Sequence, residues 1–212
     1  MIVKVCGMVE GGNIRDVETA GADWMGFIFV EKSPRCVKAL PCYLPSRSKR
    51  VGVFVNASIA YITEKIRTFA LDIVQLHGNE SPGFCQELRE SAQLSTLKIM
   101  KMMPVATKDD LKKTEEYAPL VDYFLFETKE KTKGATYYGG SGKQFDWNVL
   151  DHYQGPTPFL LTGGIGPDDV ENIRTFRHTQ MAGIDLNSRF EISPGLKDAP
   201  MLRQFIKDIR AV

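Results

Sequence analysis

The sequence predicts a single-domain α/β protein over residues 1–212, with the (βα)8-barrel (TIM-barrel) fold and a closed parallel sheet of eight strands. Short apolar, β-branched segments recur about every 25 residues, and a polar turn and a helical pattern follow most of them. The segments are almost continuously apolar, as expected of parallel strands covered on both faces. A length of 212 residues lies at the low end of the range for this fold.

The predicted elements alternate along the chain. The eight strands are expected at 2–6, 25–30, 50–55, 73–77, 96–102, 123–127, 158–162 and 183–186. Helical patterns occupy 13–21, 58–69, 81–92, 107–118, 146–153, 167–176 and 199–210. Capping residues are predicted at Asn13, Ser58, Ser81 and Thr107. The proline-rich segment 36–46 predicts a short or irregular second crossover.

A doubly wound open sheet also alternates strands with helices and is the structural alternative. Eight units without a dinucleotide-binding fingerprint favour the closed barrel. The glycine-rich turns also fall late in the chain, where barrels often hold a phosphate in the loops after strands seven and eight.

Composition narrows the possible partners. Lys and Arg total 27 and Asp and Glu total 26, so a net charge of +1 gives no global attraction for nucleic acid or an anionic membrane. The N-terminal residues lack a signal-peptide pattern and no apolar run reaches the length of a membrane span, so we expect a cytoplasmic protein. Four cysteines without a CxxC pair or a nearby His predict neither a metal site nor a disulfide framework.

Several strands carry polar residues on one face. Side chains alternate along a strand and the outer face packs on helices, so the polar face should line the barrel mouth. The side chains expected to point inward are Lys4, Cys6, Gln75, His77, Leu125, Glu127 and Asp185. Barrel interiors are normally filled by branched apolar side chains, so this convergence of polar groups predicts a catalytic pocket.

Each of these residues also has a purely structural interpretation. A lone Cys near a strand end is more often core filler than a reactive group, and Glu127 could simply pair with Lys4 or Lys129. Lys4 lies one inward position below Cys6, roughly 6–7 Å away along the strand. A cation at that range favours the thiolate, so we expect Cys6 to be the reacting group.

Three turns after the late strands predict a phosphate site. Their backbone N–H groups can approach an anion closely, although each turn alone could be a tight connection. The residues concerned are Gly140, Ser141, Gly142, Gly163, Gly164, Asn187 and Ser188. Arg35, after the second strand, could clamp a carboxylate with its planar fork or remain solvated.

The order and spacing of these segments resemble the phosphoribosylanthranilate isomerase family of tryptophan biosynthesis over essentially the whole chain. The matching segments are Lys4-Val5-Cys6-Gly7, Gly26 to Phe29 with Ser33-Pro34-Arg35, Val51 to Asn56, Gln75-Leu76-His77-Gly78, Gly139 to Gly142 before Phe145-Asp146-Trp147, Gly163-Gly164-Ile165, and Glu191 with Ser193-Pro194-Gly195.

The resemblance implies an Amadori rearrangement of N-(5-phosphoribosyl)anthranilate to the 1-deoxyribulose phosphate product, without metal or cofactor. Cys6 would be the general base and Glu127 the general acid. Arg35 would hold the anthranilate carboxylate and Asp185 would face the anthranilate ring or amine. The phosphate would lie against Gly142, Gly164 and Ser188. Lys4 and His77 are assigned to the substrate pocket as well, with His77 a rim residue of undefined role.

Three features depart from the family pattern. The family has Asp where this chain has Glu127, whose extra methylene moves the carboxyl outward by more than about 1 Å. Extra charged residues occupy 129–138, and Arg189 stands where a small residue is usual, either beside the phosphate or in solvent.

Other functions remain open at this point. The histidine-pathway isomerase performs the same rearrangement with an aspartate at strand one, where this chain has Cys6. Indole-glycerol-phosphate synthase shares the phosphate site but expects catalytic lysines and an N-terminal extension. A phosphate-binding barrel without turnover is the non-enzymatic alternative, because of the change at Glu127. A monomer and a homodimer are both compatible with the sequence.

Overall fold

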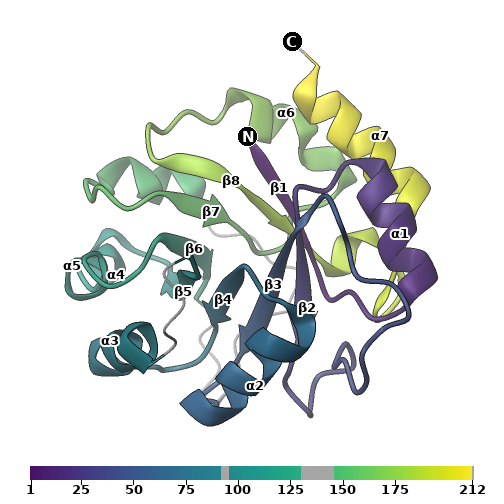
Figure 1. Ribbon diagram of the computed structural model, residues 1–212. Coiled ribbons are helices and arrows are strands. Elements are labelled where there is room, and N and C mark those ends of the chain that lie inside the picture. Colours follow the sequence, from purple (N-terminus) through teal and green to yellow (C-terminus); the bar gives the residue numbers. More distant parts are fainter. Residues whose placement is uncertain (92–95, 130–145, 212) are drawn as a thin grey trace.

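The computed structural model describes residues 1–91, 96–129 and 146–211. Eight parallel strands form a closed barrel in sequential order, and hydrogen bonds between β1 and β8 close it (Figure 1). The strands are β1 Ile2–Cys6, β2 Trp24–Ile28, β3 Lys49–Phe54, β4 Ile73–Leu76, β5 Lys98–Val105, β6 Tyr123–Thr128, β7 Phe159–Leu161 and β8 Met181–Leu186. The predicted fold is confirmed, and the predicted strand ends differ from these by at most three residues.

Helices surround the barrel on the outside (Figure 1). They are α1 Gly11–Ala20, α2 Ile59–Phe69, α3 Pro82–Ser91, α4 Lys108–Leu111, α5 Thr114–Tyr117, α6 Val170–Thr175 and α7 Ala199–Arg210, with 3-10 helices η1 Trp147–His152, η2 Pro167–Asp169 and η3 Ser188–Phe190. None of the helices in the described residues is both long and apolar enough to cross a membrane.

The capping predictions have mixed outcomes. Ser58 and Ser81 accept hydrogen bonds from the backbone N–H groups of Tyr61 and Phe84, as a cap should. The prediction for Asn13 is wrong, because α1 begins at Gly11. The Asn13 amide instead exchanges two hydrogen bonds of 2.9 Å with the backbone N–H and C=O of Lys197.

Two predicted helices take other forms. The segment 107–118 is two short helices rather than one, because the Thr114 hydroxyl donates to the Leu111 carbonyl and competes with the helical hydrogen bonds there. Thr107 lies at the start of α4, where Asp110 accepts from its backbone N–H. The segment 146–153 is the 3-10 helix η1, capped by Asp146.

The second crossover is irregular, as the prolines predict, and only a bridge between Ile28 and Cys36 interrupts the loop over 36–46. The sequence did not predict the hairpin of β9 Glu191–Ser193 and β10 Leu196–Lys197, which turns at Pro194-Gly195 after the last barrel strand.

Burial confirms the predicted alternation of side chains. Residues assigned to the outer face are fully buried in the layer between barrel and helices, namely Val3, Val5, Val74, Leu76, Phe124 and Phe126. A second apolar cluster fills the barrel itself, namely Trp24, Val51, Ile73, Met100, Met102, Leu125 and Leu160. Cys6 packs with Ile28 and Val53 in a third cluster, nearer to the C-terminal end of each strand.

Candidate active site

Five buried polar side chains stand at the C-terminal ends of the barrel strands. They are Lys4 and Cys6 on β1, His77 after β4, Glu127 on β6 and Asp185 on β8. The closed parallel barrel brings these strand ends together at one mouth. The structure therefore places these predicted residues at the end of the barrel where the fold carries its chemistry.

Cys6 depends on its strand neighbour for space. Gly26 pairs with Cys6 in the sheet, and a Cβ atom at Gly26 would lie 2.6 Å from the Cys6 sulfur. Burial raises the pKa of the Cys6 thiol, although the fields of Lys4 and Lys197 act to lower it. Lys4 thus acts on the Cys6 pKa in the predicted direction, but burial of the thiol outweighs it.

Lys4 does not reach into an open pocket. Its Nζ donates to Asp185 Oδ2 at 2.8 Å, and both side chains are buried. Burial acts to lower the pKa of Lys4, but Asp185 and Cys6 raise it above its ordinary value, so Lys4 stays charged. The second oxygen of Asp185, Oδ1, is buried without a hydrogen-bond partner among the described residues.

Glu127 contacts His77. Oε2 of Glu127 lies 3.1 Å from Nε2 of His77, and the other ring nitrogen, Nδ1, lies 2.8 Å from Nε2 of Gln75. The two ion pairs considered from the sequence are not formed, because Lys129 pairs with Asp110 and Lys4 pairs with Asp185. The structure therefore gives His77, whose role the resemblance left undefined, a direct contact with the expected acid.

Arg35 lies at the same end of the barrel. Its Nε is 2.9 Å and 3.0 Å from the two carboxylate oxygens of Glu191, and its Nη2 is 2.6 Å from Oε2. Lys197 Nζ also donates to Glu191 Oε1, at 2.6 Å. Burial acts to raise the pKa of Glu191, but Arg35, Lys197 and the N–H of Gly195 hold it below its ordinary value.

Lys197 is a site residue that the sequence reasoning missed. Burial lowers its pKa, and its Nζ donates to Asn187 Oδ1 at 2.7 Å. A Cβ atom on Gly7, which has a φ of +81°, would lie 3.4 Å from this Nζ. The Pro194-Gly195 turn was the available signal, because a hairpin there returns the chain toward the barrel.

The predicted phosphate turns are described only in part. Gly163 and Gly164 have φ values of 96° and 68°, which favour glycine, and Ser188 begins η3. The side-chain oxygen of Asn187 accepts from Lys197 Nζ, which fixes the orientation of this side chain. Gly140, Ser141 and Gly142 lie outside the described residues.

Arg189 lies against the turn that precedes η2. A Cβ atom on Gly166 would be 3.1 Å from the Arg189 Nε, so the exposed guanidinium group sits beside this turn. Arg189 is both exposed to solvent and next to Gly166, so the structure is compatible with either of the two positions that the sequence left open.

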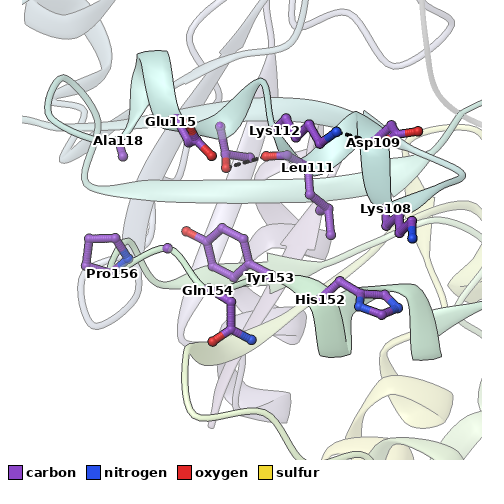
Figure 2. Close-up of a pocket in the computed structure, with 12 residues that line it drawn as sticks. Lys108, Asp109, Leu111, Lys112, Glu115, Ala118, His152, Tyr153, Gln154 and Pro156 are labelled. Atoms are coloured by element: carbon purple, nitrogen blue, oxygen red, sulfur yellow. Dashed lines mark hydrogen bonds and ion pairs between the residues drawn. The ribbon is translucent and has the colours of Figure 1, made fainter.

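A pocket of about 650 Å³ lies elsewhere, between α4, α5 and residues 152–156. Figure 2 shows its lining, with Lys108 and Lys112 on one wall and His152 and Tyr153 opposite. Burial raises the pKa of Tyr153 to about 12, and its hydroxyl donates to the Thr157 carbonyl. None of the residues predicted for catalysis lines this pocket.

The fold and the mouth residues together define a class. A closed (βα)8 barrel with a buried thiol, a carboxyl group contacting a histidine, and two buried lysines is an enzyme scaffold suited to moving protons. Within the described ranges, no three His, Cys, Asp or Glu side chains are grouped as a metal site requires.

Comparisons with known proteins specify the family. The family model for N-(5'phosphoribosyl)anthranilate (PRA) isomerase matches residues 3–208. The chain is 51% identical to the N-(5'-phosphoribosyl)anthranilate isomerase of Parabacteroides distasonis, over 99% of this chain and 93% of the relative. It belongs to the phosphoribosylanthranilate isomerase family and is an isomerase of tryptophan biosynthesis.

Solved structures agree with this family. The phosphoribosyl anthranilate isomerase of Thermotoga maritima is 30% identical, with a TM-score of 0.79 and coverage of 100% of both chains. A phosphoribosyl anthranilate isomerase solved in complex with reduced 1-(o-carboxyphenylamino)-1-deoxyribulose 5-phosphate is 26% identical, with a TM-score of 0.77 and full coverage of both chains.

Proposed function

We propose that this isomerase converts N-(5'-phosphoribosyl)anthranilate to 1-(2-carboxyphenylamino)-1-deoxyribulose 5-phosphate with Cys6 as general base and Glu127 as general acid. The observation that carries the assignment is the buried thiol of Cys6 at the same barrel mouth as the buried carboxyl group of Glu127. The reaction needs one group that gives a proton and one that removes a proton.

The proton transfers follow a fixed order. Glu127, in its protonated form, gives a proton to the furanose oxygen, the C1–O bond breaks, and the nitrogen lone pair forms the C1=N bond of a protonated Schiff base. The thiolate of Cys6 then removes the proton from C2, and the electron pair moves into a C1=C2 bond to give the enolamine. Tautomerisation of the enolamine, with proton return to C1, yields the ketone.

Two side chains support orientation of the substrate. Asp185 Oδ1, buried and without a hydrogen-bond partner among the described residues, is an acceptor for the N–H of the anthranilate amine. The guanidinium group of Arg35 has paired N–H donors in one plane, an arrangement suited to a carboxylate. In this structure Nε and Nη2 donate to the carboxylate of Glu191. Binding of the anthranilate carboxylate therefore requires Arg35 to exchange partners or to share its donors.

The phosphate would lie on the late turns. Gly163, Gly164 and the start of η3 at Ser188 offer backbone N–H groups, as the related isomerase in complex with a phosphorylated product analogue would require. The predicted contribution of Gly140, Ser141 and Gly142 is part of the same proposal. We further propose that the protein is cytoplasmic, that it acts on this small phosphorylated substrate without a cofactor, and that it works as a monomer or homodimer.

The experiment that tests the proposal follows anthranilate fluorescence as purified protein consumes freshly made phosphoribosylanthranilate. Cys6→Ala and Glu127→Gln should each lower kcat by a factor of about 10² to 10⁴, the usual contribution of a general acid or base. Cys42→Ala, at an exposed cysteine, should leave the rate unchanged. No consumption by the parent protein would exclude the reaction, and full activity in Cys6→Ala would exclude Cys6 as the base.

A further inference from the structure

Lys101 is a charged residue buried on the outer face of the barrel. It lies on β5 between Met100 and Met102, which fill the barrel interior, so its own side chain points toward the layer between strands and helices. Only 3% of its surface is exposed. The buried residues of this layer are mostly apolar, so an ammonium group there requires polar partners.

The partners of Lys101 belong to the turn after β4. Its Nζ lies 3.0 Å from Oε2 of Glu80, 2.7 Å from the carbonyl oxygen of Gly78 and 3.4 Å from that of Leu76. These three acceptors match the three hydrogens of an ammonium group. Leu76 and Gly78 directly flank His77 in the chain. The ammonium group therefore holds the carbonyl groups of both neighbours of this histidine.

The carboxylate of Glu80 binds the same turn and connects it to β3. Its Oε1 accepts from the backbone N–H of Asn56 at 2.8 Å, and its two oxygens lie 3.2 Å and 3.0 Å from the backbone nitrogen of Gly78. The side-chain oxygen of Asn56 in turn accepts from the backbone N–H of Asn79 at 2.8 Å. These hydrogen bonds join the loop after β3 to the turn after β4.

The backbone at His77 has little room to move. Its N–H donates to the carbonyl of Phe54 on β3 at 2.8 Å. A Cβ atom on Gly78 would lie 2.5 Å from Asn56 Oδ1 and 2.8 Å from Glu80 Oε1, so the turn packs closely against its own acceptors. Residues 76–80 are therefore held against both β3 and β5.

The ion pair of Lys101 and Glu80 lies outside the barrel, whereas the side chain that it frames lies inside the mouth. His77 Nε2 is 3.1 Å from Glu127 Oε2, and β5, which carries Lys101, lies between β4 and β6. A buried ion pair is often no more stabilising than apolar side chains of similar volume. Stability alone therefore does not account for a charged pair in this layer, but a requirement for exact geometry at the turn does.

We propose that Lys101 is a positioning residue, which holds the backbone around His77 from outside the barrel and thereby keeps the imidazole ring against the carboxyl group of Glu127. The inference rests on the proposed role of Glu127 as the general acid. Proton transfer to the furanose oxygen requires a defined direction of this carboxyl group, and a displacement of about 1 Å can cost a factor of about 10² in rate. Lys101 acts through the backbone and does not touch the substrate.

Lys101→Met removes the three donors and keeps most of the length of the side chain. In the fluorescence assay kcat should fall by a factor of about 10 to 10². KM should change by less than about twofold, because Arg35 and the late turns stay in place. The matched control is Lys98→Met, at the N-terminal end of the same strand, where the lysine is paired with Asp122 at 2.9 Å. This end is opposite the mouth, so the control should keep the kcat and KM of the parent.

A double-mutant cycle on kcat shows whether Lys101 acts through His77. Once the ring is removed in His77→Asn, loss of Lys101 should cost nothing further, so the double variant should be as slow as His77→Asn alone. Multiplied losses would overturn the inference, because a general structural role predicts them. Parental kcat in either His77→Asn or Lys101→Met would overturn it as well.

A second variant keeps the test decisive if Lys101→Met fails to fold because the Glu80 carboxylate loses its buried cation. Lys101→Met combined with Glu80→Gln removes both charges and retains an oxygen that can accept from the Gly78 N–H, and it enters the same cycle with the same expected result. An inactive Glu127→Gln beside a fully active Lys101 variant would refute the role of Lys101 alone. Full activity in Glu127→Gln would remove Glu127 as the acid, and the inference with it.

Discussion

Arg35 and Glu191 form a forked ion pair, in which Nε contacts both carboxylate oxygens and Nη2 approaches Oε2 to 2.6 Å. Lys197 shares the same carboxylate. One buried anion therefore holds two cations in place, one beside the expected position of the substrate carboxylate and one beside Cys6. Glu191 is accordingly a structural determinant of the site without being assigned any step of the reaction.

The Glu191 carboxylate should make stability depend on pH in the acid range. Its pKa is lowered in the folded protein, so its stabilising contribution is complete above the unfolded value of about 4.3 and is lost as pH falls through the lower folded value. Urea denaturation of the parent at several pH values below 5 should show this loss. Glu191→Gln should show a flatter dependence over that window, and an identical slope would contradict the assignment.

Removal of one partner of the Lys4–Asp185 ion pair should lower the free energy of unfolding more than removal of both partners. Lys4→Met leaves a buried carboxylate without its cation and should lower the free energy of unfolding by about 3–5 kcal/mol. The double variant Lys4→Met with Asp185→Asn should recover part of that loss. A double-mutant cycle in urea measures the coupling, and simple additivity of the two changes would disprove it.

The space for the Cys6 thiol should be a requirement for turnover. In Gly26→Ala the new Cβ would lie 2.6 Å from the sulfur, so the thiol must move, and kcat should fall by a factor of about 10². Gly12→Ala is the matched control, because nothing lies within 4 Å of its added Cβ. That variant should keep full activity and gain about 0.5–1 kcal/mol of stability from helix propensity.

Shortening Glu127, the proposed general acid, should slow this enzyme. Glu127→Asp withdraws the carboxyl group by about 1.5 Å from His77, which it contacts at 3.1 Å in the parent. We expect kcat to fall by a factor of about 10 to 10². A faster Glu127→Asp variant would show instead that the longer acid is a handicap.

Arg189 should contribute to recognition of the phosphate. Its guanidinium lies over Gly166, next to the predicted phosphate turns, and is exposed to solvent. Arg189→Ala should raise KM by a factor of about 3 to 5, equivalent to the roughly 1 kcal/mol of an exposed charge pair, with little change in kcat. The difference between variant and parent should shrink at high salt, and equal KM values at low salt would exclude the contact.

The sequence predicted the fold and the faces of the strands because both depend on local patterns. Alternation along β1 and β6 placed Lys4, Cys6 and Glu127 inward, as observed. The pairing partners could not be predicted in the same way. Lys4 bonds to a residue 181 positions away, and only closure of the barrel decides that Asp185 rather than Glu127 lies opposite.

Asn13 and Lys197 also show that local sequence patterns do not predict tertiary contacts. Asn13 has the side chain of a helix cap, but a tertiary contact with the hairpin backbone decides its role. Lys197 lies in a polar stretch, where a lysine is normally solvated, and the Pro194-Gly195 turn before it indicates only that the chain returns toward the barrel. Both positions became interpretable only when the two ends of the chain were seen together.

The contacts between the two ends of the chain also order events during synthesis. Lys4 can bond to Asp185 only after Asp185 has been synthesised. In the same way, Asn13 can bond to Lys197 only after synthesis of this lysine, 184 positions later. A nascent chain that lacks its last strand and hairpin has an open sheet edge at β1 and an unpaired lysine below Cys6. The ion pair below Cys6 and the closure of the barrel at β1 therefore both depend on residues near the C-terminal end of the chain.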